Sequence, residues 1–560
     1  MRIVRASRAE YHAEGDIRYR NGTGVRRRIE LQLRHLFSWR TFSTWVTVVP
    51  AALTLVLGVA FLGRASMWTD EAATWFSSIQ PVSNFVRNST YVDVVFLPYY
   101  LFMHFWLGVS QSLWWMRLPS LLAGAATVEA LVLLARRWLP LGWSVLAGLL
   151  LALNPLFAEW TIQARPYAAA TLFAVLSTAA LASAIDRGGT LRWVRYGLAS
   201  LGMLLLHLMA VFVLAAQLVG VAIARRRSAW AGMAPTLGCV AVAVSPLAVI
   251  AASETRQISW IPPVTPRTFL QALADVSGGR AGALALVICG IIVAATIAST
   301  PPGSDRALGF ALCLAWGTVP VLLLVLVSFL RPLYVARYAV VSLPGVALLE
   351  AMGGWRAWTI LTAPGRTRDT SGPGTQAPPA LGSARRHDRP RWAFVMATIA
   401  GGAACVAGLA LLAHTSHVLR QRYVYDDYRS AAAVLSTDLL ERPAPVAVIP
   451  NWSGVGFSYY ATPSALAHAL SGQAIRAYNR HLLDWQKVTL GSGNGEPLQR
   501  SSVVSWPIGA KPNAPTARCA VGWVIGRGVA PSKTFIIDGS SCRLSRVHYY
   551  GLAWIASAGG

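Results

Sequence analysis

The sequence contains few charged residues for its length. Asp, Glu, Lys and Arg make up 13% of the 560 residues, about half of the usual share in globular proteins, and only three residues are lysine. Hydrophobic residues account for 55%, and the mean hydropathy is +0.48. This composition excludes an ordinary globular protein and predicts a chain that is mostly embedded in a membrane.

The chain also lacks the glycine-rich phosphate-binding motifs of nucleotide-binding proteins, and it shows no internal repeat. Transport driven by a nucleotide therefore has no support. The net charge of +26 comes mainly from arginines that cluster between apolar runs rather than on one face, which argues against nucleic-acid binding. These arginines instead indicate the orientation of the chain, because Lys and Arg accumulate in short cytoplasmic loops.

Apolar runs of about 20 residues, the length that crosses the hydrocarbon core, recur along the first 415 or so residues. One signal peptide cannot account for them. We expect an all-α polytopic membrane protein with about eleven transmembrane helices plus juxtamembrane helices. The predicted spans are residues 42–63, 117–135, 143–158, 166–185, 193–206, 208–224, 231–252, 281–299, 307–330, 334–352 and 393–413.

The positive charges predict a cytoplasmic N-terminus. Ten arginines lie among the first 40 residues, so residues 1–41 are expected inside and the loop 64–93 outside. Further basic clusters that suit cytoplasmic loops lie at Arg136-Arg137, Arg187 to Arg195, Arg225 to Arg227 and 353–392. An odd number of spans then places residues 414–560 outside. Residues 94–109 would break this alternation if they crossed, so we expect them to form a partly embedded juxtamembrane helix.

The C-terminal part differs from the rest in composition. Residues 363–392 are rich in Pro, Gly, Arg and Ser and are expected to form a disordered cytoplasmic linker before the last transmembrane helix. Residues 414–560 alternate a helical stretch with strand-like runs, which predicts a small α/β extracytoplasmic domain. The helix is expected at 426–440, and the strands are expected at 444–449, 521–525 and 534–537.

The predicted tail domain contains two of the six cysteines and several aromatic residues. Because the tail is expected in an oxidising compartment, a disulfide between Cys519 and Cys542 is favoured. The other four cysteines lie in apolar spans, where they are expected to be small buried hydrophobic residues. Aromatic side chains of the tail could stack on sugars, but burial in the core of the domain is the commoner use. They include Trp452, Tyr459, Tyr460 and Trp485.

Two adjacent carboxylates, Asp70 and Glu71, follow the first predicted span. Carboxylates close to a bilayer are costly unless they have a function. The alternative is that both acids simply favour the N-terminus of a short interfacial helix, where negative charge is stabilised. An aromatic-rich stretch and then Asp93 complete the same outside loop.

Two further polar segments are predicted on the outer surface. The first runs from Glu159 through Gln163 and Arg165 to Tyr167. The alternative interpretation, without a functional role, is a solvated loop that leads into a helix at Pro166. The second runs from Arg331 to Tyr338 and includes Arg337. Arginines outside oppose the positive-inside bias, and a phosphate at the membrane surface would explain them because guanidinium pairs with phosphate oxygens. Pairing with lipid headgroups is the alternative.

These residues together resemble the GT-C superfamily of polyprenyl-phosphate-sugar glycosyltransferases, in the branch related to protein O-mannosyltransferases and lipid A aminoarabinose transferases. The resemblance covers about residues 40–350. Its features, in order, are the Asp-Glu within Trp68 to Ala72, Asp93 followed by Pro98-Tyr99-Tyr100, Arg117 to Ser120, Gln163 to Tyr167, Arg337-Tyr338 and Pro344. The segment before Pro98 departs from the family, since it reads Val94-Val95-Phe96-Leu97.

The resemblance implies an enzyme with Asp70 as the base that deprotonates the acceptor, and with Glu71 beside it as an orienting or secondary acid. Arg337, with Arg165, would stabilise the departing phosphate. The expected donor-binding residues are Asp93, Tyr99, Tyr100, His104, Glu159, Gln163, Arg165, Tyr167, Arg337 and Tyr338. A structural histidine is commoner than a catalytic one at His104 and at His207. A divalent metal ion held by Asp70, Glu71 or Asp93 stays open.

The expected reaction moves a mannose-like or arabinose-like sugar from a polyprenyl-phosphate lipid to a lipid, glycan or protein acceptor, with inversion, at the outer face of the plasma membrane. Two functions of other classes remain as alternatives. A transporter or flippase would need charged residues at the midpoints of spans, and Glu129 is the clearest example here. A non-catalytic cell-envelope assembly protein would use the tail to bind polymer.

Overall fold

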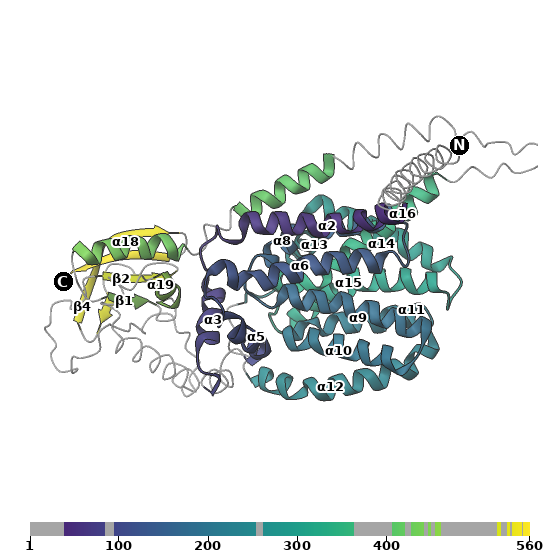
Figure 1. Cartoon of the computed structure of the whole chain (residues 1–560), viewed down its shortest axis with the longest axis horizontal. Helices are drawn as coiled ribbons and strands as arrows, with labels where there is room; N and C mark the ends of the chain where they lie inside the picture. Colours follow the sequence, from purple (N-terminus) through teal and green to yellow (C-terminus); the bar gives the residue numbers. More distant parts are fainter. Residues whose placement is uncertain are drawn as a thin grey trace, which may run out of the picture.

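The computed structural model describes residues 39–83, 94–253, 261–362, 406–420, 427–441, 446–449, 454–460, 523–527, 535–537, 540–550 and 553–559. Figure 1 shows a bundle of long helices and, beyond one end of it, a small α/β tail domain. Two short helices, α3 and α5, stand at the end of the bundle that faces the tail domain. The predicted fold class is confirmed.

Most predicted spans coincide with helices of the bundle. The long ones are α2 (Trp39–Leu62), α6 (Leu113–Ala135), α9 (Tyr167–Arg187), α12 (Trp230–Ser253), α14 (Arg280–Ala298), α15 (Asp305–Leu330) and α16 (Leu343–Leu361), the last preceded by the 3₁₀ helix η5 (Ala336–Ser342). By length and hydropathy, seven helical segments of the described chain can cross a membrane, or eight if a bent pair counts as one span. The predicted number of eleven also includes shorter helices and a last span that lies partly outside the described residues.

Two further predicted spans correspond to helices that are shorter than the long ones named above. Residues 193–206 lie in α10 (Thr190–Leu206), and residues 208–224 form η2 (Leu208–Ala210) with α11 (Val211–Ile223). The predicted last span, 393–413, lies partly outside the described residues, and its described end belongs to a helical stretch over 406–420. The linker 363–392 and the N-terminal residues 1–38 lie outside the described residues as well.

The expectation of one continuous span over 143–158 is wrong. The chain forms α7 (Leu141–Ala152) and α8 (Pro155–Thr161), which meet at an angle of 67°. Asn154 explains the break, because its side chain accepts a hydrogen bond from Phe157 N at 3.1 Å and donates one to Val276 O at 2.9 Å. Pro155 suits the first turn of the new helix. The break turns α8 into the interior, where all seven of its residues are buried.

The juxtamembrane layer consists of α3 (Thr69–Ile79) and α5 (Leu97–Leu107), with η1 (Val94–Phe96) before α5. His104 joins the two helices, since its Nδ1 lies 2.7 Å from the carbonyl oxygen of Ser78. Tyr99, Tyr100 and Met103 of α5 pack into one apolar cluster with Ala72 of α3. The eleven residues of α5 are too few for a span, as expected for the segment 94–109.

The tail domain contains α18 (Tyr428–Glu441), α19 (Gly454–Tyr460) and a five-stranded sheet of order β1-β2-β5-β4-β3. The strands are β1 (Val446–Ile449), β2 (Trp523–Arg527), β3 (Phe535–Ile537), β4 (Ser540–Tyr550) and β5 (Ala553–Gly559). β1 and β2 are parallel, and the other pairs are antiparallel. The predicted helix and three strands are confirmed, and β4 and β5 were missed. Cys519 lies outside the described residues, so its disulfide with Cys542 stays a prediction.

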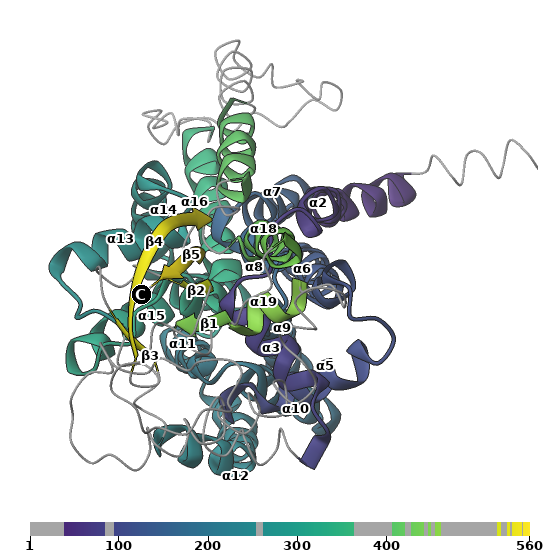
Figure 2. The same ribbon diagram turned by 90° about the vertical axis from the view of Figure 1, so that its left-hand side faces the viewer.

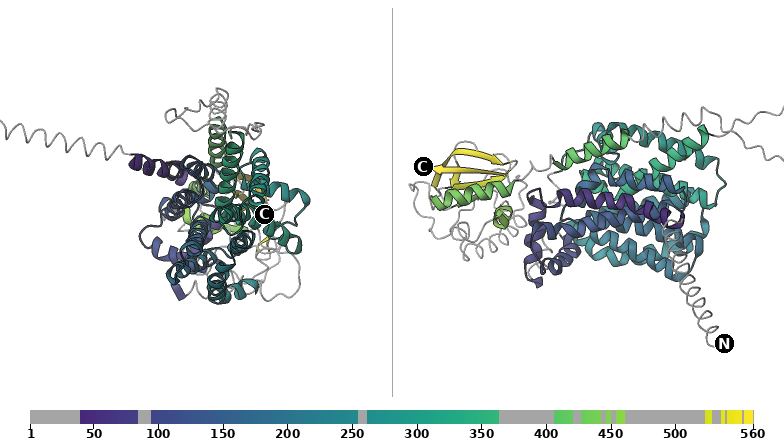
Figure 3. Two further views of the ribbon diagram at one scale, coloured as in Figure 1. Left: turned by 90° about the vertical axis from the view of Figure 1, so that its right-hand side faces the viewer. Right: turned by 45° about the horizontal axis from the view of Figure 1, so that its top comes forward.

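Figure 2 looks onto the end of the molecule that carries the tail domain, and α18 and α19 lie in front of α3 and α8. The further views in Figure 3 again show the tail domain beyond the end of the bundle where α3 lies. The helices α6, α9 and α11 all run away from this end, and the basic clusters that follow them therefore lie at the opposite end. There, Arg137 pairs with Asp186, and Arg226 pairs with Asp305.

Glycines allow close helix crossings in the bundle, and Gly345 lies at one of these crossings. A Cβ at Gly345 of α16 would lie 2.6 Å from Cγ and 2.7 Å from the carbonyl carbon of Trp316 in α15. We expect Gly345→Ala to push these helices apart, at a cost of about 1–3 kcal/mol, and to lower the melting temperature in detergent.

Gly238→Ala is the matched control, because Gly238 also lies within a long helix and a Cβ there meets nothing within 4 Å. Its melting temperature should stay the same or rise slightly, since Ala favours helix over Gly. Equal melting temperatures for the two variants would show that the crossing is not tightly packed.

Candidate active site

The two acids occupy the first turn of α3. Trp68 is the N-cap residue in extended conformation and makes no side-chain cap bond, and Asp70 and Glu71 follow in the first turn. The helix predicted by the alternative interpretation therefore exists, and its N-terminal dipole favours both carboxylates. However, each carboxylate also has an arginine partner from another element, which a simple helix terminus does not require.

Glu71 forms a completely buried ion pair with Arg117 of α6. The two side chains are 0% and 2% exposed, and the closest oxygen and nitrogen lie 2.6 Å apart. Arg117 Nε binds the other carboxylate oxygen at 2.7 Å, so the pair is bidentate. The backbone N–H of Ala164 donates to the same oxygen at 2.9 Å. Glu71 thus joins α3, α6 and the segment before α9.

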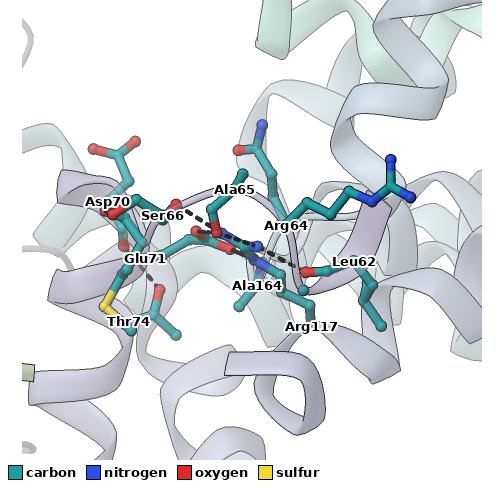
Figure 4. A network of polar contacts seen from close by, with 12 residues as sticks. Leu62, Arg64, Ala65, Ser66, Asp70, Glu71, Thr74, Arg117 and Ala164 are labelled. Atoms are coloured by element: carbon teal, nitrogen blue, oxygen red, sulfur yellow. Dashed lines mark hydrogen bonds and ion pairs between the residues drawn. The ribbon is translucent and has the colours of Figure 1, made fainter. Parts of the chain in front are cut away.

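Arg117 also holds the stretch of chain between α2 and α3. Beyond its two bonds to Glu71, it donates to the carbonyl oxygens of Leu62 at 2.8 Å, Ala65 at 3.1 Å and Ser66 at 3.0 Å. These contacts use all five N–H donors of a guanidinium. Figure 4 shows this network, in which the Asp70 side chain points away from the buried pair. The unsatisfied carbonyls at the end of α2 thereby gain partners.

Asp70 lies beside Arg337 of η5. Their closest nitrogen and oxygen are 3.3 Å apart, and the side chain of Asp70 is 26% exposed while that of Arg337 is 16% exposed. Arg165 also contacts this part of α3. It donates to the backbone oxygen of Asp70 at 3.1 Å and to Thr74 Oγ1 at 3.2 Å. Its guanidinium lies 4.0 Å from the centre of the Phe96 ring. The structure thus brings together the two predicted arginines and the predicted base.

A cavity of about 270 Å³ lies next to these residues. Its lining combines polar groups with aromatic and aliphatic ones, which suits a ligand that is charged at one end and apolar at the other. Trp68 and Trp160 line it and meet edge to face, with ring centres 6.0 Å apart. The lining residues are Phe61, Ala65, Ser66, Trp68, Glu71, Arg117, Leu156, Trp160, Ile162, Gln163, Val335, Ala336, Arg337 and Leu419.

A cluster of aromatic rings, which includes His207, lies next to Arg337. The ring of His207 lies 5.3 Å from that of Tyr167 and 5.5 Å from that of Tyr338. Burial lowers the pKa of His207 to about 4, a hydrogen bond with the backbone of Tyr338 opposes this, and the charge of Arg337 lowers it further. His207 is therefore neutral at ordinary pH and does not compete with Arg337 for an anion.

Other predicted site residues occupy different places. Glu159 is buried in α8 and accepts a bond from Gln163 at 3.4 Å. Tyr99 and Tyr100 pack in the interior between α5 and α3, and His104 binds the far end of α3. The contacts of these three residues help to hold the juxtamembrane layer together. Asp93 lies outside the described residues.

The sequence alone did not predict the role of Arg117, nor the contributions of Trp68 and Trp160 to the cavity. Arg117 was noticed only as part of a motif, although an arginine near the start of an apolar helix signals a buried partner. The described residues hold no group of three or more His, Cys, Asp or Glu side chains that could bind a metal. Each of the two neighbouring carboxylates instead faces an arginine.

Residues 94–251 match a family model described as "Dolichyl-phosphate-mannose-protein mannosyltransferase". This segment contributes Arg117, Arg165 and the wall of α8 to the site described above. The match covers less than a third of the chain. No curated protein matches the sequence.

Two solved structures of other proteins are similar to this chain. "ArnT from Cupriavidus metallidurans bound to Undecaprenyl phosphate" matches with a TM-score of 0.49 and 12% identity, over 92% of this chain and 98% of that one. AglB from Archaeoglobus fulgidus, described as an archaeal oligosaccharyltransferase with an inhibitory peptide and a dolichol-phosphate, matches with 0.42 and 12%, over 76% of this chain and 60% of that one. With TM-scores below 0.5, neither likeness decides the substrate.

The buried ion pair predicts a large effect of removing one partner. Arg117→Met would leave the Glu71 carboxylate buried without its counter-charge, at a cost of about 3–5 kcal/mol. We expect a sharp loss of folded protein and of melting temperature in detergent. Arg137→Met is the control, since the exposed pair with Asp186 contributes about 0–1 kcal/mol. Similar losses in the two variants would contradict the role given to Arg117.

His207 predicts a loss of stability in mild acid. Its pKa of about 4 in the fold is below the value of about 6.5 for an unfolded chain, so the unfolded state binds more protons between these values. Stability contributed by neutral His207 is complete above about pH 6.5 and falls as the pH decreases toward 4, by about 2 kcal/mol at pH 5.

His207→Gln should reduce the difference in melting temperature between pH 7.5 and pH 5, because glutamine does not titrate. The comparison with the parent protein at both pH values removes the contribution of groups that both proteins share. An unchanged difference would show that His207 protonates without cost.

Proposed function

We propose that the chain is a GT-C glycosyltransferase, which transfers a sugar from a polyprenyl-phosphate donor to an extracytoplasmic acceptor, with Asp70 as the base and Arg337 as the phosphate ligand. The observation that carries the proposal is the Asp70–Arg337 pair at 3.3 Å, because Arg337 also lines the 270 Å³ cavity. A carboxylate that is open to solvent thus adjoins a cation that faces a mostly apolar cavity.

In this reaction the acceptor hydroxyl gives its proton to the Asp70 carboxylate while its oxygen forms a bond to the anomeric carbon. The bond from that carbon to the phosphate oxygen breaks, and polyprenyl phosphate leaves with the electron pair. Attack from the face opposite the leaving group inverts the anomeric centre. Arg337 stabilises the negative charge that develops on the phosphate.

The contacts of Glu71 and Arg165 favour positioning roles for both residues. All donors of Arg117 point at Glu71 and at loop carbonyls, and the Glu71 carboxylate accepts three hydrogen bonds. We therefore assign Glu71 the orienting role rather than proton transfer. Arg165 contacts the backbone of Asp70 and the Phe96 ring, so it positions the base instead of binding the phosphate.

The orientation of the enzyme follows from where its arginines lie. The basic clusters after α6, α9 and α11 stand at the end of the bundle opposite to Asp70, and short cytoplasmic loops collect such charges. We therefore propose that the Asp70 site and the tail domain lie outside the cell, at the outer surface of the plasma membrane, with the N-terminus inside. The donor is then used on the outer leaflet.

For the sugar, the description of the matching family favours mannose, and an arabinose-like pentose is the other candidate. The acceptor is a lipid, glycan or protein of the cell envelope. The cavity is large enough for a phosphate and a sugar ring but too small for the whole donor lipid, so the prenyl chain must extend between helices or into the bilayer.

Asp70→Asn tests the base directly, because the amide keeps the size of the side chain but cannot accept the proton. We expect transfer from a polyprenyl-phosphate sugar in reconstituted membranes to fall by about 10²–10⁴-fold in kcat. The KM for the donor should change little. Asp186→Asn, the same substitution at the opposite end of the bundle, should leave the rate unchanged. Undiminished transfer by folded Asp70→Asn would overturn the assignment.

A further inference from the structure

We propose that the tail domain is part of the catalytic apparatus, because three of its residues position the loop that carries Asp70. Tyr428, Arg429 and Tyr460 form what is called here the tail clamp, and residues 63–69 form the catalytic loop. The inference rests on the proposed role of Asp70. It assigns the tail domain a function in transfer that requires no binding of substrate by the tail itself.

Tyr460 holds the middle of the catalytic loop. It is the last residue of α19, and its hydroxyl oxygen accepts a hydrogen bond from the backbone N–H of Met67 at 2.6 Å. Met67 itself is completely buried, so no water can replace Tyr460 without opening this cluster. The bond joins residues that are 393 positions apart in the sequence, and it lies three residues before the base.

Arg429 and Tyr428 hold the two ends of the same loop. Arg429 donates to the carbonyl oxygens of Gly63 and Arg64, at 3.3 Å each, and more weakly to that of Ala65 at 3.5 Å. The hydroxyl of Tyr428 lies 3.2 Å from Thr69 Oγ1. Thr69 is the first residue of α3 and directly precedes Asp70. Arg429 also lies 5.6 Å from the ring centre of Tyr460, which links the parts of the clamp.

The catalytic loop is therefore held from two sides. Arg117 binds the carbonyls of Ala65 and Ser66 from the membrane side, while Arg429 reaches Ala65 from the tail side. Apart from the first residue of α3, the loop has no helical or strand structure. The side chains of Arg117 and Arg429 therefore supply hydrogen bonds to backbone groups that a helix or a sheet would otherwise satisfy. The backbone position of Asp70 follows from both sets of contacts.

This arrangement differs from simple attachment of a domain. A tail that served only as an accessory could attach anywhere on the outer surface, but its polar contacts to the bundle concentrate on the seven residues before the base. Displacements of about 1 Å at a catalytic group reduce rates strongly. The clamp is thus expected to affect the chemical step more than the binding of the donor.

Tyr459 offers a matched control next to Tyr460. Its hydroxyl donates to the backbone oxygen of Gln111 at 2.9 Å, and its ring meets that of Trp75 edge to face at 5.2 Å. Tyr459 thus attaches the same helix to the same membrane part but touches the loop after α5 rather than the catalytic loop. Substitution by Phe removes one hydroxyl in either case and leaves the ring.

The experiment compares Tyr460→Phe and Tyr459→Phe in the full-length protein, reconstituted with a polyprenyl-phosphate sugar. We expect Tyr460→Phe to lower kcat about 10-fold and to leave KM for the donor within about 2-fold. Tyr459→Phe should leave kcat within about 2-fold. Hydrogen exchange is measured in parallel, and the peptide with Met67 should exchange about 10-fold faster in Tyr460→Phe only.

Each remaining outcome overturns one of the two proposals. Equal kcat in the two variants, or a fall in kcat that matches a general loss of melting temperature without faster exchange at Met67, would refute the tail clamp. If Asp70→Asn keeps full activity while Tyr460→Phe still speeds exchange at Met67, the clamp exists but the assigned base is wrong. The two failures are therefore distinguishable.

Discussion

The buried ion pair between Arg117 and Glu71 is the constraint on which the site depends. Taking both charges out of water is expensive, and the cost is offset only when every donor and acceptor has a partner. Here the partners are loop carbonyls and the backbone of Ala164, so the requirement to satisfy one charge pair fixes four segments of the chain at once. Asp70 precedes Glu71 directly, so the same contacts fix its backbone, while its own side chain stays partly exposed to solvent.

The two acids, adjacent in sequence, therefore have separate tasks because their environments differ. Glu71 has no access to water and accepts three hydrogen bonds, which hold its side chain in place. Asp70 faces an arginine across 3.3 Å at a partly open surface. In the proposed reaction, a phosphate that pairs with Arg337 in the cavity competes with Asp70 for the same guanidinium. The proposal therefore couples binding of the donor to the availability of the Asp70 carboxylate.

The sequence predicted what depends on local patterns. Apolar runs identified the long helices, alternation identified β1 to β3, and charge placed Asp70, Arg165 and Arg337 on one surface. It did not predict contacts between distant segments: the partner of Glu71 is 46 residues away, and that of Met67 is 393 residues away. The tail tyrosines were expected in a domain core, but Tyr459 and Tyr460 contact the membrane part instead.

The break between α7 and α8 was not predicted, although the sequence contains a signal for it. Asn followed by Pro is typical of a helix N-terminus, but the prediction of one span over 143–158 relied on hydropathy alone. A length criterion alone counts such a segment as one span, although Asn154 satisfies the groups that the break exposes.

The clamp also concerns how the protein is made. Residues 63–69 leave the ribosome early, whereas Tyr428 and Tyr460 follow only after every helix of the bundle has been synthesised. Until the tail has folded, the loop before Asp70 is held on one side only, by Arg117. If the proposed function is correct, an unfinished or truncated copy would reside in the bilayer without consuming the donor that complete copies need.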